Sequence, residues 1–138
     1  MQNCRFAFAV HVMAVLARQK SDCCPSSRLA KTVNTNPVVI RRLLIDLQEA
    51  GLISTIRGPL GGATLKRTPE KVTLRDIHAA VDQGNTFATH PNEPSAECPV
   101  GKNIGKVMQH IQERANRALA RELEKTTLAD VLRELKRG

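Results

Sequence analysis

Aromatic side chains are nearly absent from this chain. Its 138 residues include three Phe and neither Trp nor Tyr. Sandwiches and barrels rely on aromatic and β-branched residues for packing, so the shortage favours a mainly helical fold. It also argues against a platform of exposed rings that would stack on single-stranded nucleic acid.

Cysteine motifs are lacking as well. The chain has four cysteines, which form neither a Cys-x-x-Cys motif nor a dense framework: Cys4, Cys23, Cys24 and Cys98. With 41% hydrophobic residues the chain has enough apolar side chains for a core, so we expect reduced thiols in a cytoplasmic protein rather than disulfides. The four histidines are not paired at metal-ligand spacing, and the sequence predicts no metal site.

Catalytic motifs and long apolar runs are also absent. Gly58–Gly62 is glycine-rich, but a predicted strand follows it, whereas a phosphate-binding loop leads into a helix. The chain is therefore not expected to be an enzyme. The apolar run over residues 6–17 contains His11 and is too short to cross a bilayer, so it predicts a packed helix rather than a signal peptide or a membrane partner.

Positive charge is abundant and uneven. The formal net charge is +8, and residues 1–67 hold ten Lys or Arg against three Asp or Glu. The N-terminal half therefore suits a polyanion such as double-stranded DNA. Charge alone leaves open that these side chains are simply solvated.

Apolar periodicity predicts six helices and two strands. In the N-terminal half, helices are expected over about 6–19, after an N-cap at Ser26 or Ser27, and from Pro37 to a left-handed Gly51. In the C-terminal half, they are expected after Thr73, over about 21 residues around 104–123, and after Thr127. Strands are expected at 52–57 and 63–66, joined by residues 58–62, and residues 85–97 read as a loop.

Three helices followed by a hairpin predict a winged helix-turn-helix, giving a mainly α fold with a small β-wing. We assign residues 1–83 to this DNA-binding domain and 84–98 to a sensor-type loop. Residues 99–138 are assigned to a long C-terminal dimerisation helix and a last helix. One face of residues 104–123 is apolar, which favours a homodimer; the alternative is that this face packs wholly against its own chain.

The DNA-binding residues are expected on the third helix and the wing. The N-terminal end of a recognition helix enters the major groove, where Arg pairs with guanine or phosphate. Arg57 suits a narrow minor groove, and a glycine beside it lets the backbone approach DNA. The predicted set is Ser27, Asn36, Val38, Arg41, Arg42, Arg57 and Gly58. The alternative is a winged helix used only for protein contacts.

Specific motifs strengthen this interpretation. Asn34-Thr-Asn-Pro-Val-Val-Ile-Arg-Arg-Leu-Leu44 resembles the helix-turn-helix of the Rrf-two (Rrf2) family of bacterial regulators, and Arg57-Gly-Pro-Leu-Gly-Gly62 resembles its wing. Thr73–Ile77 is similar to its next helix, and Cys98–Asn103 to the start of its dimerisation helix. The resemblance implies a dimeric transcription factor, usually a repressor, on a near-palindromic operator. It leaves open a small-molecule or protein effector, and a second function in which the chain regulates a metabolic enzyme by binding it.

The chain departs from the family at its sensor loop. Cluster-bearing members resemble one another in having three cysteines there, whereas this loop has Cys98 alone. A cluster needs several thiolates, so we expect no iron–sulfur cluster and no other cofactor. Cys98 precedes Pro99, which favours a helix start, and the helix dipole with Lys102 would favour a redox-active thiolate. The alternative is a buried small hydrophobic residue retained from a cluster-binding ancestor.

Overall fold

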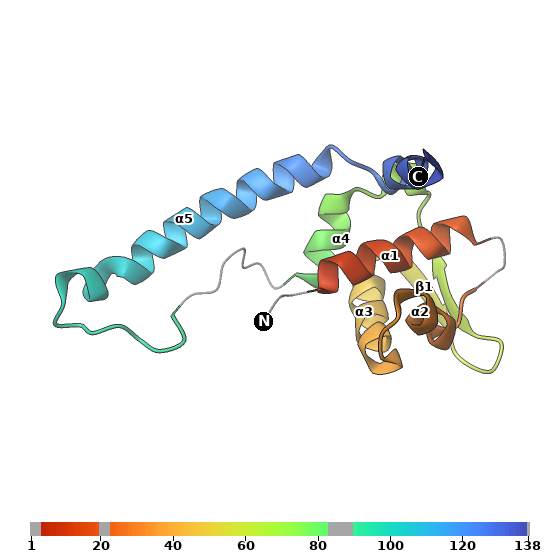
Figure 1. Cartoon of the computed structure of the whole chain (residues 1–138), viewed down its shortest axis with the longest axis horizontal. Coiled ribbons are helices and arrows are strands. Elements are labelled where there is room, and N and C mark those ends of the chain that lie inside the picture. Colours follow the sequence, from red (N-terminus) through yellow and green to blue (C-terminus); the bar gives the residue numbers. More distant parts are fainter. Residues whose placement is uncertain (1–3, 20–22, 83–89, 138) are drawn as a thin grey trace.

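A computed structural model describes residues 4–19, 23–82 and 90–137 of the chain. Its first three helices form a helix-turn-helix unit: α1 (Arg5–Arg18), α2 (Ser26–Val33) and α3 (Pro37–Glu49) (Figure 1). α2 ends because Asn34 adopts the left-handed conformation, with φ 63°. The expected serine cap is wrong, since α2 starts at Ser26 itself and Pro25 occupies the N-cap position.

A two-stranded antiparallel sheet follows α3 and forms the wing. β1 (Ile53–Ile56) pairs with β2 (Gly62–Leu65), with Ile53 opposite Leu65. Gly51 lies between α3 and β1 in the left-handed conformation, φ 77°, as the sequence predicted. The strands lie where the β-branched residues indicated: β1 is two residues shorter than the predicted 52–57, and β2 is shifted by one residue from the predicted 63–66.

The wing is attached to the segment that precedes α2. Cys24 and Ala63 exchange two backbone hydrogen bonds of 2.8 Å each. A Cβ atom on Gly62 would lie 2.4 Å from the Cys24 backbone, so only glycine permits this approach. The wing is thereby held beside the helix-turn-helix unit.

Three more helices complete the fold, after the short 3₁₀-helix η1 (Pro69–Lys71): α4 (Leu74–Val81), α5 (Pro99–Glu124) and α6 (Leu128–Arg137). The predicted helix start after Thr73 is confirmed, since Thr73 and Asp76 form a capping box at the start of α4 with hydrogen bonds of 3.0 and 3.1 Å. Thr127 and Asp130 cap α6 in the same way. α5 has 26 residues, more than the apolar pattern marked, and starts at Pro99 with Cys98 as its N-cap.

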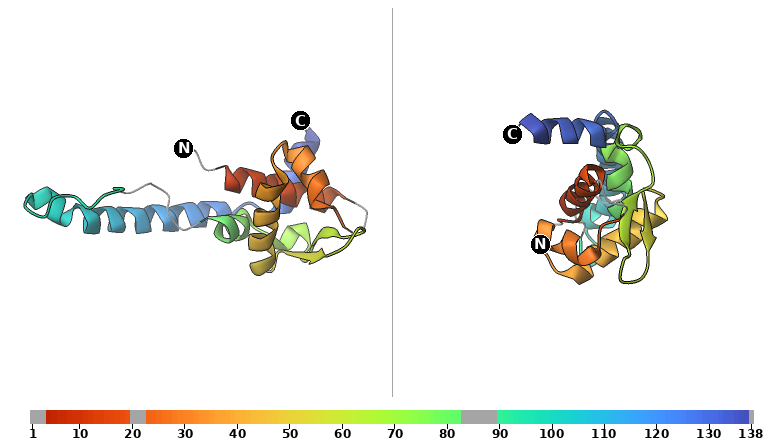
Figure 2. Two further views of the ribbon diagram at one scale, coloured as in Figure 1. Left: turned by 90° about the horizontal axis from the view of Figure 1, so that it is seen from below. Right: turned by 90° about the vertical axis from the view of Figure 1, so that its right-hand side faces the viewer.

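The core joins α6 to the N-terminal helices. Leu128 is fully buried, and its backbone N–H donates to the Val72 carbonyl at 2.8 Å. Figure 2 shows α6 crossing close to α1, and the two helices are in contact. Arg5 adds a polar link, since its side chain pairs with Asp46 of α3 and donates to the Val81 carbonyl at 3.1 Å. Most of the described chain is thus built around one core.

α5 extends from this body as a long arm (Figures 1 and 2). It packs against α4, and Arg75 of α4 forms a 3.2 Å ion pair with Glu124 at its C-terminal end. Gln112 is the one residue of α5 that is buried, while Val100 is 67% exposed and Val107 49% exposed. The apolar face of α5 is therefore not wholly covered by the described part of its own chain.

Part of the predicted sensor-type loop, residues 84–89, lies outside the described residues. Residues 90–98 form neither helix nor strand, as the sequence predicted. Within the described ranges, no helix combines the length and the apolar character needed to cross a membrane.

We expect Leu128→Ala to destabilise the chain by about 2–5 kcal/mol, because it removes a buried side chain and leaves a cavity. Leu60→Ala is the matched control, since Leu60 is 92% exposed and exposed substitutions usually cost no more than about 0.5 kcal/mol. The midpoint of urea unfolding measures both changes. Equal midpoints for the two variants would contradict the assignment of α6 to the core.

Candidate nucleic-acid interface

A groove of about 500 Å³ lies between α3 and the wing. α3 contributes Arg41 and Ile45 to its lining, and the wing contributes Arg57 and Gly58. Three residues of the predicted DNA-binding set, Arg41, Arg57 and Gly58, therefore share one concave surface. A positively charged groove of this kind suits the phosphate backbone and base edges of a duplex.

The two arginines of α3 are exposed because the opposite face of the helix is in the core. Ile40, Leu43 and Leu47 are buried, whereas Arg41 and Arg42 are exposed. Arg41 lines the groove, and Arg42 lies outside its lining. The structure thus gives the two arginines different surroundings, which the sequence did not distinguish.

The start of α3 is fixed by Asn36. Its side-chain Oδ1 accepts a 2.8 Å hydrogen bond from the Val38 backbone N–H, which caps the helix. Val38 in the first turn is 45% exposed. Asn36 belongs to the predicted DNA-binding set; its side-chain oxygen is used in the cap, so its side-chain NH2 group is the donor that remains for a further hydrogen bond.

The structure adds residues that the sequence did not single out. Ser26 lines the groove, while the predicted Ser27 is exposed on α2 outside that lining. Gln48 of α3 and Thr55 of β1 also line it, and the Thr55 hydroxyl donates to Gln48 Oε1 at 2.5 Å. This hydrogen bond joins the recognition helix to the wing. No sequence motif marks it, because it depends on the packing of α3 beside β1.

The four cysteines differ in their surroundings. Cys98 is exposed at the start of α5, so the buried alternative is wrong for the described chain. The backbone N–H groups of Gly101 and Val100 lower the pKa of the Cys98 thiol. Lys102 is not among the causes of this shift. Burial raises the pKa of the Cys24 thiol, which is packed beneath the wing.

The described residues do not offer the donor set of an iron–sulfur cluster. Cys23 and Cys24 lie at the base of the wing, Cys98 lies at the start of α5, and Cys4 precedes α1. Across residues 4–19, 23–82 and 90–137, no three His, Cys, Asp or Glu side chains lie together as metal ligands. A cluster held by several thiolates does not fit this arrangement.

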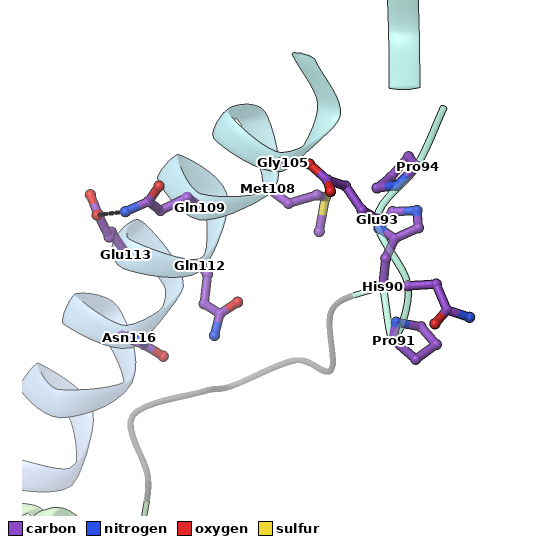
Figure 3. A pocket seen from close by; sticks show the side chains of 11 residues that line it. His90, Pro91, Glu93, Pro94, Gly105, Met108, Gln109, Gln112, Glu113 and Asn116 are labelled. Atoms are coloured by element: carbon purple, nitrogen blue, oxygen red, sulfur yellow. Dashed lines mark hydrogen bonds between the residues drawn. The ribbon is translucent and has the colours of Figure 1, made fainter. Parts of the chain in front are cut away.

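A second groove, of about 560 Å³, lies between residues 90–94 and α5. Figure 3 shows Met108 pointing toward the segment that carries His90 and Glu93. On α5 itself, the side-chain amide of Gln109 donates a hydrogen bond of 3.5 Å to Glu113 Oε1. The lining of this groove thus includes imidazole, amide and carboxylate groups, all of which can form hydrogen bonds.

Known proteins resemble the chain throughout its length. The Rrf2 family, described as iron-dependent transcriptional regulators, matches residues 2–134. The candidate HTH-type transcriptional regulator YwnA of Bacillus subtilis (strain 168) is 37% identical over 136 residues, which cover 98% of this chain and 99% of that protein.

Solved structures agree with this match. One, of a candidate DNA-binding protein, is 32% identical, has a TM-score of 0.71 and covers 93% of this chain and 98% of its own. CymR, the global cysteine regulator of B. subtilis, is 21% identical with a TM-score of 0.68 over 97% of both chains, and so bears on the fold. These relatives are regulators or DNA-binding proteins rather than enzymes. The chain belongs to the Rrf2 family of transcriptional regulators.

Proposed function

We propose that the chain binds double-stranded DNA as a homodimer and represses transcription from a near-palindromic operator. The observation that carries this proposal is the groove in which Arg41 of α3 and Arg57 of the wing line one surface. The repressor role rests on the resemblance of the helix-turn-helix and wing motifs to those of Rrf2 regulators.

In the proposed complex the N-terminal part of α3 lies in the major groove. Arg41, Arg42 and Val38 are exposed there, and an arginine in this place bonds to guanine or to phosphate. Arg57 and Gly58 bring the wing to the adjacent minor groove, whose negative potential attracts arginine. Ser27 on α2 and the amide of Asn36 complete the proposed contact set.

The proposed dimer forms through α5. This helix leaves apolar side chains exposed along its length, including Val100 and Val107, and a second copy would cover them. Twofold symmetry would present two recognition helices to successive turns of DNA, about 34–36 Å apart.

The proposed function includes no iron–sulfur cluster. The dispersed cysteines support this, and any redox input is proposed to act through the exposed Cys98 thiol. A thiolate at a helix N-terminus is more reactive than a buried thiol.

The double variant Arg41→Ala, Arg57→Ala should bind an operator recovered from genomic DNA at least about tenfold more weakly, since each good arginine contact contributes about 1–3 kcal/mol. Lys136→Ala is the control, because Lys136 is exposed and belongs to α6, the helix at the C-terminus, which lies on the far side of the body from α3 (Figure 1). Gel-shift titration at fixed salt measures the affinities. Parental affinity in a folded double variant would sink this docking arrangement.

Sedimentation velocity at tens of micromolar should give twice the chain mass of 15.2 kDa. Val107→Glu should yield a monomer that binds DNA weakly, because it places a charge in the proposed interface. Lys106→Glu introduces the same charge at the exposed neighbouring residue, about 100° around α5 from Val107 and away from its apolar stripe, and should remain dimeric. A monomeric parent chain would refute the proposed dimer.

Anaerobic purification followed by addition of iron and sulfide should give a colourless protein. The reason is that the described cysteines do not converge as cluster ligands. Visible absorption and bound iron are measured together, after desalting. A brown protein with stoichiometric iron would overturn the no-cluster proposal.

Cys98 should react with iodoacetamide at neutral pH faster than Cys24. The pKa of Cys98 is lowered, so its reactive thiolate is populated at lower pH, while burial raises the pKa of Cys24. Mass spectrometry of the alkylated peptides between pH 6 and 9 gives both rates, with Cys98→Ser as the control for assignment. Equal rates at pH 7 would contradict the proposed difference.

A further inference from the structure

Leu60 is the most exposed large apolar side chain among the described residues. It lies in the turn between β1 and β2 and is 92% exposed, whereas the other exposed large hydrophobic residues reach at most 67%. Single exposed leucines are common on protein surfaces. The structure of this turn and its place beside the groove distinguish Leu60 from an incidental one.

The turn is constrained on both sides of Leu60. The Gly61 backbone N–H donates to the Gly58 carbonyl at 2.9 Å, and a Cβ atom on Gly61 would lie 2.0 Å from the Ile56 carbonyl oxygen. The Cys23 thiol donates to the Leu60 carbonyl at 3.1 Å. Pro59 fixes its own φ. The backbone of the wing tip is therefore fixed, and it holds the Leu60 side chain in solvent.

The neighbourhood of Leu60 is the proposed DNA-binding surface. Pro59 and Gly61, which flank it, both line the groove, and so do Arg57 and Ile56. Ile56 is itself 58% exposed. An arginine suited to the minor groove thus lies three residues from a rigidly presented apolar side chain.

We infer that Leu60 acts as an apolar wedge at a base step in the minor groove. This inference rests on the proposed binding of the wing to DNA. Proteins that bind this groove use apolar side chains, including leucine, to unstack base steps and kink the duplex. Pyrimidine–purine steps such as TA are the easiest to deform. Leu60 therefore selects operators that have a flexible step opposite the wing tip, without a hydrogen bond to any base.

The experiment compares the full-length parent, Leu60→Ala, Leu60→Met and Arg57→Ala on one operator recovered from genomic DNA. Affinity is measured between 50 and 200 mM salt, and 2-aminopurine placed at the step opposite the wing reports unstacking. Leu60→Ala should bind about tenfold more weakly, with the salt dependence unchanged, since no counterion contact is lost. Arg57→Ala should reduce the salt slope by about one for each half-site.

Base unstacking and the conservative variant separate a wedge from a structural role. The parent and Leu60→Met should raise 2-aminopurine emission, because methionine keeps an apolar side chain of similar reach, and Leu60→Ala should not. Replacing the TA step opposite the wing by a stiff step should lower the operator affinity of the parent about fivefold to tenfold and leave the affinity of Leu60→Ala almost unchanged.

The failures of the two proposals are distinguishable. If Arg57→Ala weakens binding while Leu60→Ala retains parental affinity and emission, the wedge is overturned and the proposed function stands. If the parent binds no duplex more tightly than a random sequence, the proposed function is overturned and the wedge with it.

Discussion

The two backbone hydrogen bonds between Cys24 and Ala63 hold the wing in place beside α2 and so shape the groove between α3 and the wing. They attach the wing to the segment that leads into α2, and they form only because Gly62 has no side chain. Gln48 and Thr55 add a second link between α3 and β1. The distance between the recognition helix and the wing thus depends on links to two different parts of the helix-turn-helix unit. The groove, its arginines and the rigid wing tip all rely on them.

A second constraint is the return of the chain after α5. The arm leaves the body with few buried residues of its own, yet α6 comes back and places Leu128 in the core. The backbone bonds from Leu74 to Thr126 and from Leu128 to Val72 fix the junction where α5 ends. The ion pair between the side chains of Arg75 and Glu124 also holds this junction together. The arm is therefore anchored at its C-terminal end to the same core that supports α3.

Much of the fold follows from local sequence signals. The helices were predictable because apolar residues recur at helical spacing and because Thr73 and Thr127 begin capping boxes. Pro37 after Asn36 marked the start of α3 for the same kind of reason. Arg41 and Arg57 were expected to act together because a winged helix brings the recognition helix and the hairpin to one side, and the groove includes both.

The features that the sequence did not reveal are those made by backbone or by long-range packing. The Cys24–Ala63 bridge uses main-chain atoms only, so no side-chain pattern announces it. The first turn of α5 carries few apolar residues, and periodicity gave a helix shorter than the observed 26 residues. The choice of Ser26 over Ser27 in the groove depends on how α2 is rotated against the wing.

The length of α5 has a mechanical consequence. At 1.5 Å per residue, its 26 residues make a rod of about 39 Å. For a rod of this length, a tilt of about ten degrees at its junction with α4 and α6 would displace the opposite end by about 7 Å. In the proposed dimer joined along α5, the separation of the two helix-turn-helix units would depend on the angle between α5 and the body of each chain. A small change of that angle would therefore change the separation of the two units by a fraction of a helical turn of DNA.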